Sequence, residues 1–163
     1  MAGPRRKPVI SSDPVLRSAA AGYRVPVGRC TFCDIAGSSL PADVVLDEGG
    51  VVAFLDHRPL FPGHVLVIPR RHVTTLADLP DGLIEPLFGA VRRVSGAVER
   101  ALEAEGTFVA ANNRVSQSVP HLHVHVVPRR RGDGLKGFFW PRHPYRGDEH
   151  RREVAAAIRS ALG

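Results

Sequence analysis

The run of residues 120–128, Pro-His-Leu-His-Val-His-Val-Val-Pro, constrains the fold of this chain more than any other segment. Its histidines alternate strictly with apolar residues, and successive side chains of a β-strand point to opposite faces. If the run is a strand, Leu122, Val124 and Val126 share one face, and this face packs in the core. The other face carries three imidazoles about 6.5–7 Å apart, and these belong to His121, His123 and His125.

Four further strands and two helices are predicted around this segment. Apolar segments at 44–46 and 51–55, separated by Gly49-Gly50, predict a hairpin, and β-branched or apolar runs at 64–68 and 107–111 predict two more strands. Apolar residues recurring every three or four positions between Asp81 and Gly106 predict a helix. These are Leu83, Leu87, Val91, Val94, Val98 and Leu102.

A last helix is predicted from about Asp148, with an acidic first turn and one apolar face formed by Val154, Ala157, Ile158 and Leu162. Strands that follow one another through turns, with helices inserted, favour an antiparallel sheet. The fold class that we predict is therefore α+β, with a five-stranded antiparallel sheet and two helices.

The positive charge of the chain is concentrated at its amino terminus. Residues 1–29 hold six basic residues against one acidic residue, whereas residues 30–163 hold 16 against 15. We expect a basic, disordered tail over 1–29 and one domain over 30–163, so that nucleic acid is an unlikely partner except through the tail. The tail lacks the apolar core of an export signal and the chain lacks the long apolar run of a spanning helix, which predicts a cytoplasmic protein without membrane contact.

The residues from 30 to 142 resemble the histidine triad (HIT) family. The signature of that family is met by residues 121–127; Gln117-Ser118 stands just before it, Asp56 ends an earlier strand, and residues 62–69 resemble the family's central strand. The resemblance implies a HIT-like fold in a homodimer that joins two sheets. It also implies hydrolysis or transfer of nucleoside monophosphates from phosphoramidates, acyl adenylates or dinucleoside polyphosphates, with AMP-containing purine nucleotides as substrates.

The same resemblance implies roles for single residues. His123 would attack the α-phosphorus and form a nucleotidyl-imidazole intermediate, which suits an imidazole that is largely neutral near pH 7. His125 would bond a phosphate oxygen, and His64 would support proton transfer. Ser118 and Gln117 would hold the phosphate or protonate the leaving group, and Asn112 or Asn113 would line the same site together with Ser116.

The nucleoside is expected to bind beside this row. Asp56 can accept hydrogen bonds from both ribose hydroxyls, although a solvated turn aspartate is the alternative. Phe32, Ile35 and Leu66 match apolar positions that sandwich the base in the family, and they fit an ordinary core equally well. Trp140 resembles a tryptophan that reaches the partner subunit's site in one branch of the family, with core packing as its alternative.

Cys30 and Cys33 have the two-residue spacing of a zinc ligand pair, and structural zinc takes four nitrogen or sulfur ligands. Free thiols and a redox pair are the alternatives. The zinc-containing bacterial members of the family imply His72 and His121 as the remaining ligands, so that a structural zinc would leave His123 free for phosphorus. Two other functions stay open: a nucleotide-binding regulator without turnover, and a zinc hydrolase that binds the metal through the histidine row itself.

Overall fold

The computed structural model of the chain describes residues 30–135 and 144–162. The chain divides into two compact units, residues 1–129 and 130–163, which are considered separately. The predicted tail over 1–29 and Trp140 lie outside the described residues. The second unit contains the predicted carboxy-terminal helix, which is α3 (Asp148–Leu162) and begins at the expected acidic residue.

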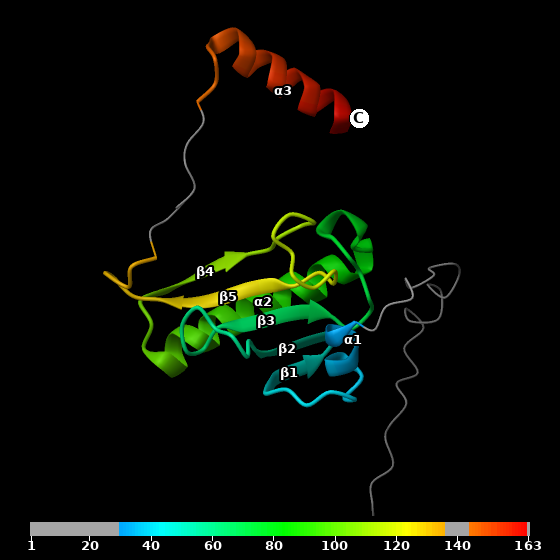
Figure 1. The fold of residues 1–163 in the computed structure, drawn as a ribbon, viewed down its shortest axis with the longest axis vertical. Coiled ribbons are helices and arrows are strands. Elements are labelled where there is room, and N and C mark those ends of the chain that lie inside the picture. Colours follow the sequence, from blue (N-terminus) through cyan, green and yellow to red (C-terminus); the bar gives the residue numbers. More distant parts are fainter. Residues whose placement is uncertain (1–29, 136–143, 163) are drawn as a thin grey trace, which may run out of the picture. The chain divides into compact units, whose positions relative to one another are not determined.

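The first unit is built on a five-stranded antiparallel sheet (Figure 1). The strands are β1 (Val44–Glu48), β2 (Val51–Leu55), β3 (Val65–Pro69), β4 (Gly106–Ala110) and β5 (Val124–Arg129). Their order across the sheet is β1-β2-β3-β5-β4, so β1 and β4 form the two edges. The prediction of a five-stranded antiparallel sheet is confirmed.

Helix α2 (Asp81–Leu102) covers one face of this sheet. Its predicted apolar stripe buries Leu87, Val91, Val94 and Val98 against the inner side chains of the strands, but Leu102 is 37% exposed because the helix ends there. Pro86 lies within the helix, in its early turns as predicted. Hydrophobic burial along this stripe is what holds the helix on the sheet.

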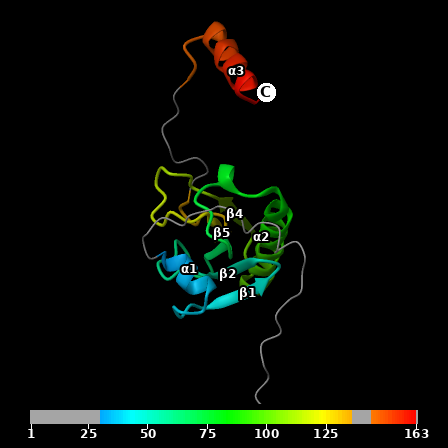
Figure 2. The ribbon, with the colours of Figure 1, turned by 90° about the vertical axis from the view of Figure 1, so that its right-hand side faces the viewer.

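The opposite face carries a second apolar cluster beneath α1 (Thr31–Ala36), so that α1 and α2 lie on opposite sides of the strands (Figure 2). Phe32 and Ile35 of α1 pack there with Phe54, Leu66 and Ile68. Neither α1 nor the short 3-10 helix η2 (Leu76–Asp78) was among the two predicted helices. Both are too short to show an apolar period in the sequence.

The histidine segment differs from the prediction in one respect. Strand β5 begins at Val124, so His121 and His123 lie before it and only His125 lies within it. Pairing between β3 and β5 stops at Val67 and Val124, although β3 continues to Pro69. The Leu122 amide instead donates to the carbonyl of Val73, 2.6 Å away. The alternation of faces persists nevertheless, because Leu122, Val124 and Val126 all belong to the core under α2.

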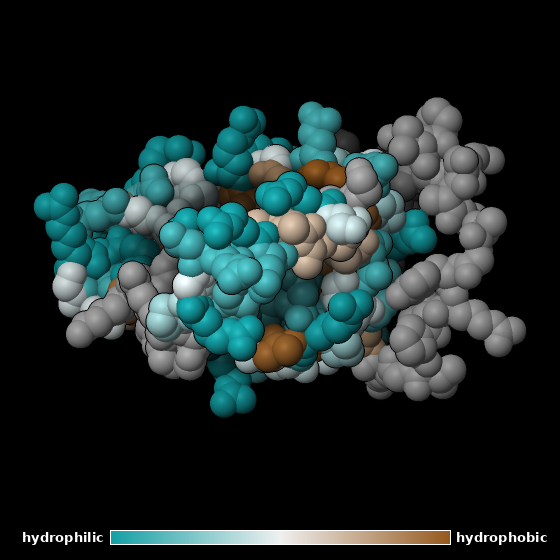
Figure 3. All heavy atoms as spheres, turned by 90° about the horizontal axis from the view of Figure 1, so that it is seen from above, coloured by the Kyte–Doolittle hydropathy of each residue, from teal (hydrophilic) through white to brown (hydrophobic). Residues whose placement is uncertain are grey.

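Most of the surface seen in Figure 3 is hydrophilic, and apolar side chains are exposed singly or in small groups. Such scattered apolar residues are ordinary for a folded chain. Among the described residues, every helix is too short or too polar to cross a membrane.

Candidate functional site

His123 is held in one defined tautomer. Its side chain is only 3% exposed, and its Nδ1 lies 2.6 Å from the main-chain oxygen of His121. A carbonyl oxygen can only accept, so Nδ1 carries the hydrogen and donates it. The lone pair of the neutral ring therefore lies on Nε2, which is the state that a nucleophilic imidazole requires.

His125 receives its tautomer through His64. The Leu60 amide donates to Nδ1 of His64 at 3.3 Å, which places the hydrogen of a neutral His64 ring on Nε2. That nitrogen lies 3.0 Å from Nδ1 of His125, so His64 donates and His125 accepts. His125 is left with its hydrogen on Nε2, and its ring centre is 4.9 Å from that of His123.

Burial keeps His64 and His125 uncharged at neutral pH. It lowers the pKa of His125 to about 4, and the neighbouring His123 and His64 act in the same direction. Burial also lowers the pKa of His64, an effect that the carboxylate of Asp56 opposes. Two neutral rings agree with the hydrogen-bond directions deduced above.

Asp56 follows β2 and lies beside His64. One carboxylate oxygen accepts the amide hydrogen of Arg58 at 2.9 Å, and the other lies 3.5 Å from Nδ1 of His64. Its side chain is 16% exposed, so part of the carboxylate faces solvent. The predicted ribose contact remains a prediction that this exposure permits.

The structure brings the three predicted base-binding residues together beside the histidines. Phe32, Ile35 and Leu66 belong to one apolar cluster and are 8%, 9% and 5% exposed. The ring of Phe32 meets that of His123 edge to face, with centres 5.2 Å apart. As they stand, these side chains are core residues, and binding of a base between them remains a prediction.

The loop before the histidines is arranged differently from the sequence prediction of a phosphate site. The Gln117 side chain donates to the carbonyl of Thr74 at 2.7 Å and accepts from the amide of Arg114 at 2.8 Å, so it braces the loop. Ser118 is exposed, and Asn112 is half-buried. The phosphate contacts of these three residues remain predictions, and the bracing role of Gln117 had no signal in the sequence.

A second cluster is formed by Cys30, Cys33, His72 and His121, the four predicted zinc ligands. One ligand atom from each lies within 4.8 Å of all the others. Nδ1 of His121 is 3.5 Å from both sulfurs, and Nδ1 of His72 is 3.2 Å from the sulfur of Cys33. Tetrahedral zinc with Zn–S of about 2.3 Å and Zn–N of about 2.0–2.1 Å separates sulfur from nitrogen by about 3.6 Å, so the four groups fit this metal.

The imidazole of His121 is ready to bind a cation, whereas the thiol of Cys33 must first lose its proton. Burial raises the pKa of the Cys33 thiol to about 12, and the adjacent Cys30 adds to the effect. Nε2 of His121 donates to the carbonyl of Pro69 at 2.9 Å, which leaves the Nδ1 lone pair facing the thiols. Burial lowers the pKa of His121 to about 4, so this ring is a neutral ligand at pH 7.

Fold and site together define a class of protein: an α+β domain with buried and half-buried histidines beside an antiparallel sheet, and next to them a cluster of sulfur and nitrogen groups that could hold a metal ion. Residues 38–132 match the HIT domain, and the chain belongs to the HIT family. An uncharacterized HIT-like protein of Mycobacterium tuberculosis is 37% identical over 138 residues, which cover 82% of this chain and 92% of that protein.

Two solved structures bear on the fold and the metal cluster. A HIT family member from Bacillus subtilis superposes with a TM-score of 0.76 at 30% identity, covering 83% of this chain and 99% of that one. A Zn-bound histidine triad family protein from Mycobacterium smegmatis superposes with a TM-score of 0.62 at 35% identity, covering 81% of this chain and 96% of that one.

Two relatives carry names that state an activity. An asymmetrical bis(5'-nucleosyl)-tetraphosphatase of Schizosaccharomyces pombe is 41% identical over 83 residues, 50% of this chain and 46% of that protein. The adenylylsulfatase HINT3 of Arabidopsis thaliana is 27% identical over 140 residues, which cover 82% of this chain and 69% of that protein. The family therefore includes hydrolases of nucleotides.

Proposed function

We propose that the chain is a nucleotide hydrolase or nucleotidyltransferase in which His123 attacks the α-phosphorus of a bound nucleotide. The observation that carries this proposal is the 2.6 Å hydrogen bond from Nδ1 of His123 to the His121 carbonyl, which directs the lone pair to Nε2. In the first step, Nε2 forms a bond to phosphorus and the leaving group departs with its electron pair. In the second, water displaces the imidazole and releases the nucleoside monophosphate.

The neighbouring side chains have distinct parts in these steps. His125 donates from Nε2 to a non-bridging phosphate oxygen, and His64 fixes His125 in the tautomer that can do so. Ser118, which is exposed in the loop before the histidines, protonates the leaving group, and Gln117 and Asn112 shape the phosphate site. Asp56 accepts from the ribose hydroxyls.

The substrate that we propose is an AMP-containing purine nucleotide, either a nucleoside phosphoramidate or a dinucleoside polyphosphate. Both share attack at the α-phosphorus and differ in the leaving group. The names of the relatives from S. pombe and A. thaliana agree with nucleotide substrates whose leaving groups differ within the family.

We also propose zinc at Cys30, Cys33, His72 and His121, where the metal would supply a fixed cross-link between α1 and the segments around β3 and β5. The two potential ligand clusters among the described residues separate His121 from His125 and include His123 in neither. This arrangement disfavours a metal hydrolase that uses the histidine row as its ligands.

A homodimer joined through β4 fits the sheet order. Strand β4 is an edge strand, and Val109 on it is 43% exposed. Ile84 and Phe88, one helical turn apart on α2, are 46% and 43% exposed. An open edge strand that exposes an apolar side chain is suited to pairing with a second copy.

Trapping of a covalent adenylate tests the proposal. Incubation with adenosine phosphoramidate, a diadenosine polyphosphate or an acyl adenylate, followed by mass spectrometry of the quenched protein, should show an adenylate on His123. His123→Ala should lose the adduct and at least a thousandfold of turnover, while His150→Ala, on α3 in the second unit, should keep both.

The same experiment separates the rival functions. Nucleotide binding without an adduct or turnover on any of the three substrates would indicate a regulator. Normal turnover by His123→Ala would refute the assignment of the nucleophile. Loss of zinc from Cys30→Ser with partial activity would support a structural metal, whereas retention of zinc would support a site on the histidine row.

A further inference from the structure

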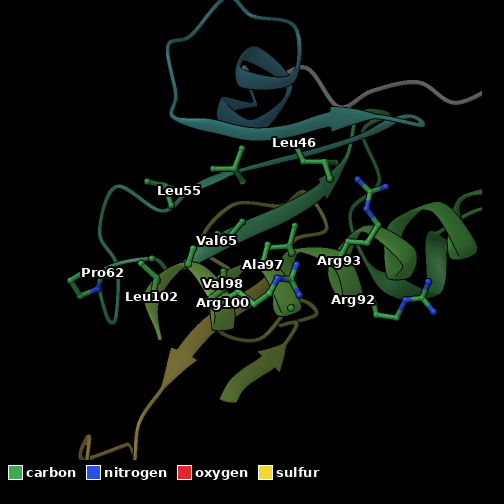
Figure 4. A pocket seen from close by; sticks show the side chains of 15 residues that line it. Leu46, Leu55, Pro62, Val65, Arg92, Arg93, Ala97, Val98, Arg100 and Leu102 are labelled. Atoms are coloured by element: carbon green, nitrogen blue, oxygen red, sulfur yellow. The ribbon is translucent and has the colours of Figure 1, made fainter. Parts of the chain in front are cut away.

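An apolar groove of about 840 Å³ lies between the carboxy-terminal half of α2 and strands β1 to β3 (Figure 4). The groove is on the α2 side of the sheet, whereas the histidine row and the cysteines are associated with the cluster under α1. Its floor consists of Leu46, Val65, Val94 and Val98. It is therefore separate from the proposed nucleotide site.

Two local features open this groove. Gly96, Ala97 and Ala101 give α2 a low surface where it faces the strands. On β1, a bulge between Val44 and Leu46 makes Val45 an extra residue, and Val45 lines the groove while remaining 54% exposed. Bulges commonly redirect a side chain in this way beside a binding site.

The rim of the groove is cationic. Arg92, Arg93 and Arg100 line it, and Arg93 pairs with Glu48 of β1. Within residues 30–135 and 144–162, no carboxylate lies within salt-bridge distance of Arg100. Its Nη1 lies 3.2 Å from the place where a side chain on Gly96 would begin, so the guanidinium lies beside Gly96, which also lines the groove.

We propose that this groove binds an aliphatic chain that ends in one anionic group, with a fatty-acid carboxylate as the occupant. The volume is within the range of about 300–1,000 Å³ for small-molecule sites, and the lining is mostly aliphatic. Leu55 and Leu102 are 39% and 37% exposed at its edge, an apolar surface that a hydrocarbon chain would cover. Arg100 supplies a charged fork that matches a carboxylate.

Titration of the full chain with dodecanoate, below its critical micelle concentration, tests this site by calorimetry. We expect one saturable site, and binding about tenfold weaker for dodecanol and for dodecylammonium, which lack the negative charge. Arg100→Gln should weaken dodecanoate binding about tenfold, and Ala97→Phe, at an exposed position of α2, should abolish it by filling the groove. Arg71→Gln, an exposed arginine outside the groove, is the matched control and should bind as the wild type does.

Circular dichroism and thermal melting establish that each variant is folded, and Arg100→Glu replaces Ala97→Phe if the latter does not fold. The proposal is overturned if dodecanoate shows no saturable binding, or if dodecylammonium binds equally well. Unchanged binding by both Arg100→Glu and the folded groove-filling variant would also overturn it. Dodecanoate-dependent self-association in sedimentation would instead make the groove a contact between copies of the chain, which contradicts a fatty-acid site.

Discussion

Acidification should destabilise this protein through His125, and the size of the effect follows from its pKa. Burial sets the pKa of the folded state at about 4, whereas an unfolded histidine has a pKa near 6.5. Between these two values the unfolded chain binds more protons, so stability is fully present above about pH 6.5 and is lost as the pH falls toward 4. From pH 8 to pH 5 the loss due to His125 is about 2 kcal/mol.

Urea unfolding at pH 8, 6.5 and 5 measures this loss, with His125→Gln as the comparison because its amide does not titrate. The wild type should lose about 2 kcal/mol more than His125→Gln over this interval. His64 remains in both proteins, and its lowered pKa adds to both curves in the same direction. Both proteins are measured at the same zinc concentration, so the pH dependence of the metal cluster contributes equally to both and drops out of the difference.

His57→Gln provides the matched control, because the His57 side chain is 88% exposed and solvent screens its 3.7 Å approach to the Asp56 carboxylate. Its stability should follow that of the wild type at every pH. Parallel curves for wild type and His125→Gln between pH 8 and pH 5 would refute the reasoning, since they would mean that His125 titrates equally in both states.

Two further predictions concern the metal cluster and the loop before His64. Zinc must displace a proton from each of the two thiols, and the pKa of Cys33 is raised to about 12, so the apparent zinc dissociation constant should fall by up to about a hundredfold per pH unit between pH 6 and 8 in chelator competition; a flat profile would argue against thiolate ligation. Gly63 has φ of +94° and a side chain there would collide with Leu102, so Gly63→Ala should cost at least about 1 kcal/mol in urea unfolding. Gly89→Ala in α2, where the space is open, should be neutral or stabilising by up to about 1 kcal/mol, and equal losses for both variants would contradict the steric argument.

Periodicity in the sequence was sufficient for the large elements of the fold. The apolar stripe from Leu83 to Val98 predicted α2, and alternation in 121–127 predicted which residues face the core. β1 extends two residues beyond its predicted end, through Asp47 and Glu48, because an edge strand with an exposed face carries no apolar pattern there. α1 was missed because six residues are too few to show a period.

The candidate site was predictable only in part. Spacing in the sequence identified Cys30 and Cys33, whereas His72 and His121 are 39 and 88 positions from Cys33 and came from family resemblance alone. The groups that set the tautomers are the His121 carbonyl and the Leu60 amide. Main-chain groups like these are present at every residue, so no residue type can reveal which one faces a ring.

His121 links the two clusters. Its ring faces the cysteine thiols, and its main-chain carbonyl accepts a hydrogen bond from Nδ1 of His123. A cation bound to the His121 ring would restrict the motion of this residue. It would thereby also fix the carbonyl that accepts the hydrogen bond from His123. If the proposed function and the proposed zinc are both right, removal of the metal would lower turnover without abolishing it, because the His121 carbonyl still holds the His123 ring when no metal is bound.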